Sequence, residues 1–152
     1  MSINNELQQH HFRNERQKAM VNILFTYGWI MERLKNIVSD EDITLQQYNI
    51  LRILRGSNPA PLSTLQIRER MIDKMSDTSR LVDRLLSKHL VKKVICKEDR
   101  RLVDVTITSK GLKLLKRLDE REDEMDSVVG NLSEKESTAL SKMLDKIRSG
   151  NN

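Results

Sequence analysis

Apolar residues recur at intervals of three and four along residues 13–38, and this spacing predicts one long amphipathic helix. A helix of that length would extend about 39 Å, which is long for so small a chain. Helices of such length often pack against a second copy of their own chain. The apolar positions are Met20, Ile23, Leu24, Tyr27, Ile30, Met31, Leu34, Ile37 and Val38.

A second helix is expected from Thr44, because Gln47 follows three residues later and the two side chains can form a capping box. The stretch GSNPAP at 56–61 ends this helix, since two prolines and a glycine in six residues predict a loop. Its inward residues are expected to be Leu45, Tyr48, Leu51 and either Ile53 or Leu54.

A short third helix is predicted over 63–71 and, after the tight connection IDKM, a fourth over 77–88 with Ser76 as its N-cap. Two alternating β-type runs follow at 91–97 and 102–108, with residues 98–101 as the turn between them. The apolar face of the fourth helix would consist of Leu81, Val82, Leu85 and Leu86.

Two more helices are predicted, one from residue 108 or 109 to about 129, the other over 133–148. The motif GNL separates them, and Ser133 with Glu136 is a good capping box for the last helix. The order α-α-α-α-β-β-α-α predicts a mainly α fold with a small β-hairpin wing, a winged helix-turn-helix flanked by long terminal helices. We expect a single domain over 1–152.

Charge is unevenly distributed along this chain of net charge +5. Residues 62–101 hold 11 Lys and Arg against 6 Asp and Glu, whereas basic and acidic residues balance in the remainder. Basic charge confined to one segment indicates a polyanionic partner such as nucleic acid, although a solvated basic surface has the same composition.

The predicted fourth helix begins with polar residues and turns apolar only at Leu81. In a helix-turn-helix the second helix enters the major groove of DNA and presents its N-terminal residues to base edges. The same residue types also favour an ordinary first helical turn. Arg84 lies four residues after Arg80 and either meets a phosphate or is simply solvated. The polar leading residues are Ser76, Asp77, Thr78, Ser79 and Arg80.

The hairpin tip carries Arg100 and Arg101, and Asp99 can pair with Arg101 across it. An exposed tip can reach an adjacent minor groove, whose negative potential attracts arginine. Lys97 on the wing strand would contact phosphate. The alternative is a solvated turn whose charges keep the hairpin edge from aggregating.

The run DKMSDTSRLVDRLLSKHLVKKVICKEDRRLVDVTITSKG, residues 73–111, resembles the DNA-binding core of the multiple-antibiotic-resistance regulator (MarR) family of bacterial transcription factors. The similarity lies in the polar-start helix ending in RLVDRLLSK, the wing tip DRR, and the entry V-x-IT-x-KG into the next helix. The helix order outside this run agrees as well, so the resemblance covers nearly the whole chain.

The resemblance implies a homodimeric repressor that binds a pseudo-palindromic operator in double-stranded DNA and can respond to a small-molecule effector. Residues 44–107 would form the DNA-binding lobe, and residues 13–38 and 108–148 the dimerisation lobe. The implied DNA-contacting residues are Thr64, Ser76, Thr78, Ser79, Arg80, Arg84, Lys97, Asp99, Arg100 and Arg101. His89 stands where the family usually has a glycine that ends the recognition helix.

For an effector, Tyr27, Met31 and Tyr48 are conceivable lining residues, but we favour a core position for each of them. Cys96 is either a redox sensor or a small buried hydrophobe. We expect no cofactor and no metal, because the histidines lack ligand spacing and no nucleophile or phosphate-binding motif is present.

Besides a regulator that binds duplex DNA, the sequence disfavours two classes of protein and leaves a third open. An enzyme is disfavoured by the missing motifs. A single-strand or RNA binder is disfavoured because all five aromatic residues lie outside the basic segment. A winged helix that binds protein instead of DNA stays open. No apolar run reaches the roughly 20 residues that cross a bilayer, and we expect a cytoplasmic protein without membrane contact.

Overall fold

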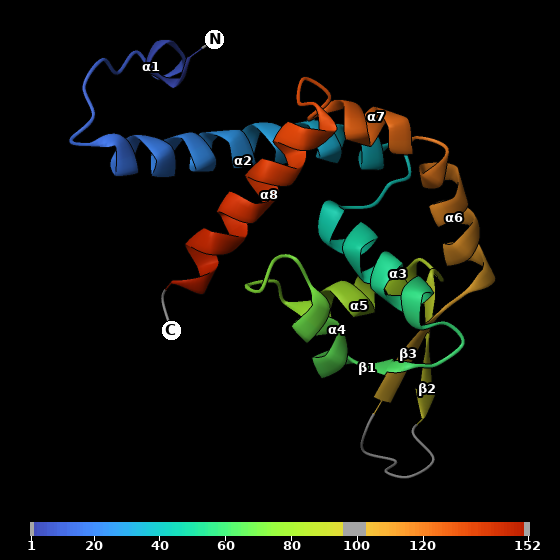
Figure 1. Cartoon of the computed structure of the whole chain (residues 1–152). Helices are drawn as coiled ribbons and strands as arrows, with labels where there is room; N and C mark the ends of the chain where they lie inside the picture. The colour runs from blue at the N-terminus through green and yellow to red at the C-terminus, as the bar shows by residue number, and fades with distance from the viewer. Residues whose placement is uncertain (1, 96–102, 151–152) are drawn as a thin grey trace.

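The computed structural model describes residues 2–95 and 103–150, and it is mainly helical with one small sheet (Figure 1). Helix α2 runs along one end of the molecule, and the wing projects from the far side of the lobe that contains α3, α4 and α5. Helices α6 and α7 lead from the sheet back towards α2. The elements are α1 (Ile3–Glu6), α2 (Glu15–Ser39), α3 (Leu45–Ser57), β1 (Leu62–Ser63), α4 (Thr64–Arg70), α5 (Thr78–Ser87), β2 (Val91–Ile95), β3 (Val103–Ile107), α6 (Ser109–Asp119), α7 (Glu122–Ser127) and α8 (Glu134–Ser149).

Helix α2 confirms the long helix predicted from the apolar spacing. It begins after Asn14, whose side chain accepts a hydrogen bond from the backbone N–H of Gln17, as an N-cap residue does. Only Ile37 and Val38, at its C-terminal end, are buried. Most of the predicted apolar stripe is therefore not covered within one copy of the chain.

Helix α3 lies at the centre of the core. Its predicted capping box is confirmed, because Thr44 and Gln47 each bond the other's backbone N–H. Leu45 and Ile53 are only partly buried, so Leu54 and not Ile53 completes the buried face. The largest side chains that are almost wholly buried are Ile50, Leu51, Leu54, Ile67, Met71, Leu85, Leu115, Leu118, Val38 and Val105.

Helices α4 and α5 form the predicted helix-turn-helix, but the N-cap of α5 differs from the prediction. Asp77 and not Ser76 caps α5, since its Oδ1 accepts from the backbone N–H of Arg80 at 3.1 Å. The hydroxyl of Ser76 is buried without a hydrogen-bond partner in the described part of the chain. Both residue types cap helices well, so the sequence does not discriminate between them.

The sheet contains a strand that the sequence analysis missed. Strand β1 has two residues and pairs antiparallel with β3, Leu62 opposite Val105, so the sheet order is β1-β3-β2. Two residues are too short for an alternating pattern to be recognised. The predicted hairpin is confirmed with Val91 opposite Ile107 and Ile95 opposite Val103.

The single helix predicted from residue 108 or 109 to about 129 is wrong. The structure has α6 and α7 with a break at Glu120 and Arg121. At this break the guanidinium of Arg121 donates a hydrogen bond to the carbonyl of Ile37, near the C-terminus of α2. The capping box of Ser133 and Glu136 at α8 is confirmed, whereas α1 was not predicted.

Candidate nucleic-acid interface

The first turn of α5 faces α4 across a hollow of about 450 Å3. Four of the residues predicted to contact DNA meet here, although they come from α4, from α5 and from the turn between the two helices. Leu65, Arg68 and Asp77 complete the lining. The predicted residues in the hollow are Thr64, Ser76, Thr78 and Ser79.

Arg68 is the residue that the sequence analysis did not identify. It is exposed and lies one helical turn after Thr64 on α4, so the two share a face. The i, i+4 spacing from Thr64 was the available signal. A guanidinium in this position offers several fixed N–H donors to an anionic group in the hollow.

Two hydroxyl groups in the hollow have unused hydrogen-bonding capacity. Thr78 is 3% exposed, and in the described part of the chain neither its Oγ1 nor the Oγ of Ser76 has a partner. Leaving a buried hydroxyl unpaired costs about 1–3 kcal/mol. Both oxygen atoms are closed to solvent, so a water molecule or ligand group in the hollow reaches them only if the side chains move.

Arg80 and Arg84 extend along the exposed face of α5. Within residues 2–95 and 103–150 neither forms an ion pair, so both charges are available to a partner. The opposite face of the helix is anchored in the core by Val82 and Leu85. Lys88, the next cation in this row, is instead engaged with Asp42.

The wing tip lies outside the described residues. This applies to Lys97, Asp99, Arg100 and Arg101, and to Cys96. Strand β2 ends at Ile95 and β3 begins at Val103, and these two described strands extend away from α2 (Figure 1). At the base of the wing, Lys93 Nζ lies 3.3 Å from Asp83 Oδ1 and joins β2 to α5.

His89 follows Lys88, the C-cap residue of α5, and adopts the left-handed conformation, with φ 59°. Its N–H donates to the carbonyl of Leu86 at 2.9 Å, and the N–H of Leu90 donates to the carbonyl of Leu85 at 3.0 Å. These two bonds define a Schellman motif. The geometry that glycine favours is thus adopted here by a histidine.

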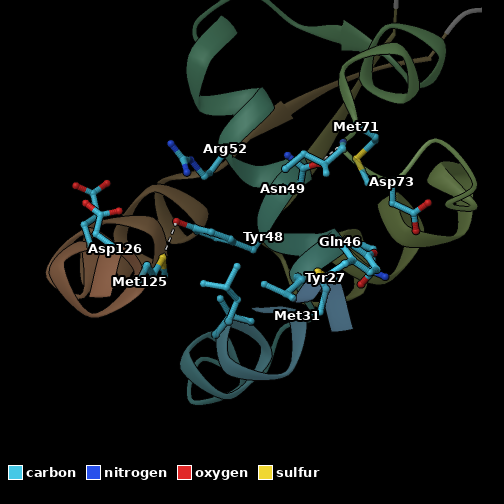
Figure 2. A pocket seen from close by; sticks show the side chains of 15 residues that line it. Tyr27, Met31, Gln46, Tyr48, Asn49, Arg52, Met71, Asp73, Met125 and Asp126 are labelled. Atoms are coloured by element: carbon cyan, nitrogen blue, oxygen red, sulfur yellow. Dashed lines mark hydrogen bonds between the residues drawn. The ribbon is translucent and has the colours of Figure 1, made fainter. Parts of the chain in front are cut away.

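A larger hollow of about 660 Å3 lies between α2, α3 and α7. Figure 2 shows Tyr48 at its centre, with Tyr27 and Met31 on the α2 side. The hydroxyl of Tyr48 donates to Met125 Sδ at 3.7 Å, and the guanidinium of Arg52 lies 5.7 Å from the ring centre. Tyr48 is 7% exposed, so it is a core residue and a lining residue at once, whereas Tyr27 is largely exposed.

Helices α2 and α8 expose apolar side chains at helical spacing, and α8 buries none of its residues. On α8 these side chains are Leu140, Met143 and Ile147; on α2 they are Met20, Ile23, Leu24, Tyr27 and Trp29.

Among the described residues no group of three or more His, Cys, Asp or Glu could hold a metal ion. No helix among them has the length and apolarity to cross a membrane.

The helix pair, the three-stranded sheet and the projecting hairpin define a winged helix-turn-helix of the kind found in transcription regulators. The sequence model of the MarR family matches residues 43–103. A MarR transcription factor from Planctomyces limnophilus is 34% identical, with 89% of this chain and 98% of that chain covered and a TM-score of 0.68. This chain belongs to the MarR family, whose members are transcription regulators and not enzymes.

Two further relatives extend the comparison. The HTH-type transcriptional regulator YpoP of Bacillus subtilis (strain 168) is 28% identical over 89 residues, which is 59% of this chain and 62% of YpoP, so the match spans less than two thirds of that relative. A MarR variant of E. coli, solved with operator DNA, is 22% identical with a TM-score of 0.79 over 90% of this chain and 98% of that chain. The second likeness is one of fold.

Proposed function

We propose that this chain is a dimeric, sequence-specific regulator that binds double-stranded DNA and represses transcription. The observation that carries the proposal is the hollow at the start of α5. It brings together Thr64 and Arg68 of α4, Ser76 of the turn before α5, and Thr78 and Ser79 of α5. Arg68 and Ser79 are exposed, whereas Thr78 is only 3% exposed. This arrangement has the polar groups and the cation that major-groove recognition requires.

Each residue of this surface has a proposed role. Ser76, Thr78, Ser79 and Arg80 would read or flank bases in the major groove, while Arg84 would bind a flanking phosphate. Thr64 and Arg68 on α4 would meet the backbone beside it, because the first helix of this motif crosses the phosphates.

The wing would make the second set of contacts. We assign Arg100 or Arg101 to the minor groove, with Asp99 holding Arg101 extended, and Lys97 to a phosphate. These residues lie outside the described part of the chain, so the support is the direction of the hairpin, which points away from α2. A narrow minor groove attracts an inserted arginine.

The dimerisation lobe would consist of residues 13–38 and 108–148, and the DNA-binding lobe of residues 44–107. The support is the apolar face of α2 and α8 that one copy leaves open. Leu24 is 63% exposed and Met143 57%. Exposed apolar side chains at helical spacing on two helices favour a helical interface with a second copy. A dimer would place two recognition helices on an inverted repeat.

The hollow around Tyr48 supports an effector response in addition. Its volume of about 660 Å3 suits a small organic molecule. Bordetella bronchiseptica BpsR, 21% identical with a TM-score of 0.72, has its DNA binding regulated by 6-hydroxynicotinic acid. For this chain we propose a small effector without assigning its structure. Binding chromosomal DNA would require a cytoplasmic location.

The test is selection of duplexes from a random pool at a fixed, near-physiological salt concentration. We expect an inverted repeat with half-sites about one helical turn apart. Arg101→Ala should lose operator affinity with the dimer intact. Lys113→Ala, which removes an exposed charge from α6, is the matched control. Enrichment of no sequence by a dimeric wild-type protein would favour the alternative, a winged helix that binds protein.

A further inference from the structure

The turn between α2 and α3 carries three consecutive carboxylates, and each is bound by a cation from further along the chain. Asp40, Glu41 and Asp42 lie just after the last residue of α2. Their partners come from the end of α5, from α6, and from the break between α6 and α7. The partners are Arg121 for Asp40, Arg117 for Glu41 and Lys88 for Asp42.

Asp42 holds the C-terminal end of the recognition helix. Lys88 is the C-cap residue of α5, and its ammonium donates to the backbone carbonyl of Asp42 and to Oδ2, the latter at 2.9 Å. The carbonyl of Lys88 accepts from Lys110 Nζ of α6 at 2.9 Å. The end of α5 is thus tied to the α2–α3 turn on one side and to α6 on the other.

Glu41 forms the geometrically strongest of the three pairs. Arg117 donates through Nε to Oε1 at 2.8 Å and through Nη2 to Oε2 at 2.5 Å, which is a two-pronged contact. The Glu41 side chain is 19% exposed, so this pair is partly shielded from solvent. The hydrogen bonds from Arg117 hold the pKa of the Glu41 carboxyl below its ordinary value.

Arg121 joins three elements through one guanidinium. Its Nη1 donates to the carbonyl of Ile37 and to Asp40 Oδ2, both at 2.7 Å. Its Nε and Nη2 donate to the two carboxylate oxygens of Glu124 in α7. A cation at the carbonyl end of α2 also interacts favourably with the helix dipole. Arg121 makes these contacts from the break between α6 and α7.

We propose that these three ion pairs form a clamp that sets the orientation of the recognition helix relative to α2 and thereby determines which half-site spacings the dimer accepts. The inference rests on the proposed function. Helix α2 buries only Ile37 and Val38, and the link from α2 to α3 is five residues long. Rotation about this link would move α5 as a unit with its lobe, and the clamp opposes that rotation. Asp40, Glu41 and Asp42 are positioning residues that touch no DNA.

A purely stabilising role would have a different signature. Ion pairs that only stabilise the fold lower the unfolding temperature when removed but leave the relative affinities for different operators unchanged. A clamp that fixes an angle restricts the separation of the two recognition helices in the dimer. Its loss lowers the affinity for the preferred spacing and relaxes discrimination against others, because a less ordered dimer loses the advantage of preorganisation.

The experiment measures affinity for a set of duplexes in which the selected half-sites are moved apart or together by one and two base pairs. The variants are Glu41→Gln, Arg117→Gln and Asp42→Asn, each tested as the full-length dimer. Asn tolerates the left-handed φ of 55° at position 42, so the backbone is kept. Asp145→Asn, which removes an exposed ion pair within α8, is the control for loss of a surface pair.

Glu41→Gln and Arg117→Gln change the net charge in opposite directions. Non-specific electrostatic attraction to DNA should therefore rise in Glu41→Gln and fall in Arg117→Gln. An exposed ion pair is worth up to roughly fivefold in an equilibrium constant, so we expect each variant to lower the preferred-to-shifted affinity ratio by about that factor or less. The double variant Glu41→Gln/Arg117→Gln should lower it no further than either single one.

Two results with the variants would overturn the clamp. One is an unchanged affinity ratio across the spacing series in all three variants that remain dimeric. The other is a change that follows net charge, with opposite signs in Glu41→Gln and Arg117→Gln. If Glu41→Gln or Arg117→Gln fails to fold, Asp42→Asn still gives the preferred-to-shifted affinity ratio. The Asp42 side chain is 98% exposed, so this substitution disturbs no packing. A wild-type dimer without any spacing preference would refute both the clamp and the proposed function, whereas a wild-type preference that all variants keep refutes the clamp alone.

Discussion

Gly111 lies so close to Leu90 that a β-carbon on it would sit 2.4 Å from the Leu90 carbonyl oxygen. The same atom would come within 2.7 Å of Cγ1 of Ile107. Gly111 is in the first turn of α6, and Leu90 follows the recognition helix. The contact brings the beginning of α6 directly onto the end of the α5 segment, and no residue with a side chain fits there.

Gly111→Ala should therefore destabilise the fold. Backbone atoms would have to move, and overpacking of this kind costs about 1–3 kcal/mol. Gly56→Ala is the control, since nothing lies within 4 Å of a β-carbon at that position of α3. There we expect a gain of about 0.5–1 kcal/mol from helix propensity. Urea unfolding of both variants measures the difference, and equal free energies of unfolding would contradict the packing argument.

His89→Gly should raise stability, because glycine adopts the left-handed conformation of this residue without steric cost. A left-handed non-glycine residue costs about 1–2 kcal/mol; histidine pays less than most, so we expect a gain of about 0.5–1 kcal/mol. His89→Val, which is β-branched, should lower the unfolding temperature. The side chain of His89 is exposed, so lost packing does not confuse the comparison. A lower unfolding temperature for the glycine variant would show that the histidine makes a contact of its own.

Leu24→Glu should convert the proposed dimer to a monomer. Leu24 lies on the open apolar face of α2 and is 63% exposed. Leu65 on α4 has the same exposed fraction but lines the hollow at the proposed DNA-binding surface. Light scattering should give a monomeric mass for Leu24→Glu and a dimeric mass for Leu65→Glu. Dissociation by both changes, or by neither, would be inconsistent with the assigned interface.

Arg84→Ala should weaken binding to all duplexes by a similar factor. Loss of one phosphate contact lowers the slope of log affinity against log salt by about 1. Arg80→Ala should act differently and relax preference at one base pair by about 1–3 kcal/mol, since its side chain lies nearer the N-terminus of α5. Titrations at several salt concentrations, on the selected operator and on single-base variants, separate the two roles. If Arg84→Ala changed the preference at a single base pair, Arg84 would contact a base and not a phosphate.

Acidification should destabilise the wild-type protein more than Glu41→Gln. Arg117 holds the pKa of the Glu41 carboxyl below its ordinary value of 4.5. The folded state therefore favours the ionised form, so this contribution is fully present above the ordinary pKa and is lost as the pH falls through the folded pKa. The unfolding free energies of the two proteins should differ at pH values above 4.5 and converge only as the pH falls through the lowered folded-state pKa of Glu41. If the unfolding free energies of the wild-type protein and Glu41→Gln change in parallel with pH, the Glu41–Arg117 pair does not contribute to stability.

Local signals determined most of the secondary structure. Thr44 with Gln47 and Ser133 with Glu136 are capping boxes whose partners lie three residues apart, so the sequence itself contains the whole interaction. The alternating runs on either side of the wing tip and the polar start of α5 are local in the same sense. These signals, with the basic segment, sufficed to indicate a winged helix and a nucleic-acid partner.

The features that depend on contacts between residues far apart in the chain were decided only by the tertiary structure. Strand β1 forms by pairing Leu62 with Val105, and Arg121, in the break after α6, donates a hydrogen bond to Ile37, 84 residues away. The hollow that joins Arg68 to the start of α5 depends on how two helices pack. The carboxylates at the α2–α3 turn look like solvated charge in the sequence, and their cations are distant in it. The physical reason is that capping and periodicity act over a few residues, whereas ion pairs and strand pairing form wherever folding brings their partners together.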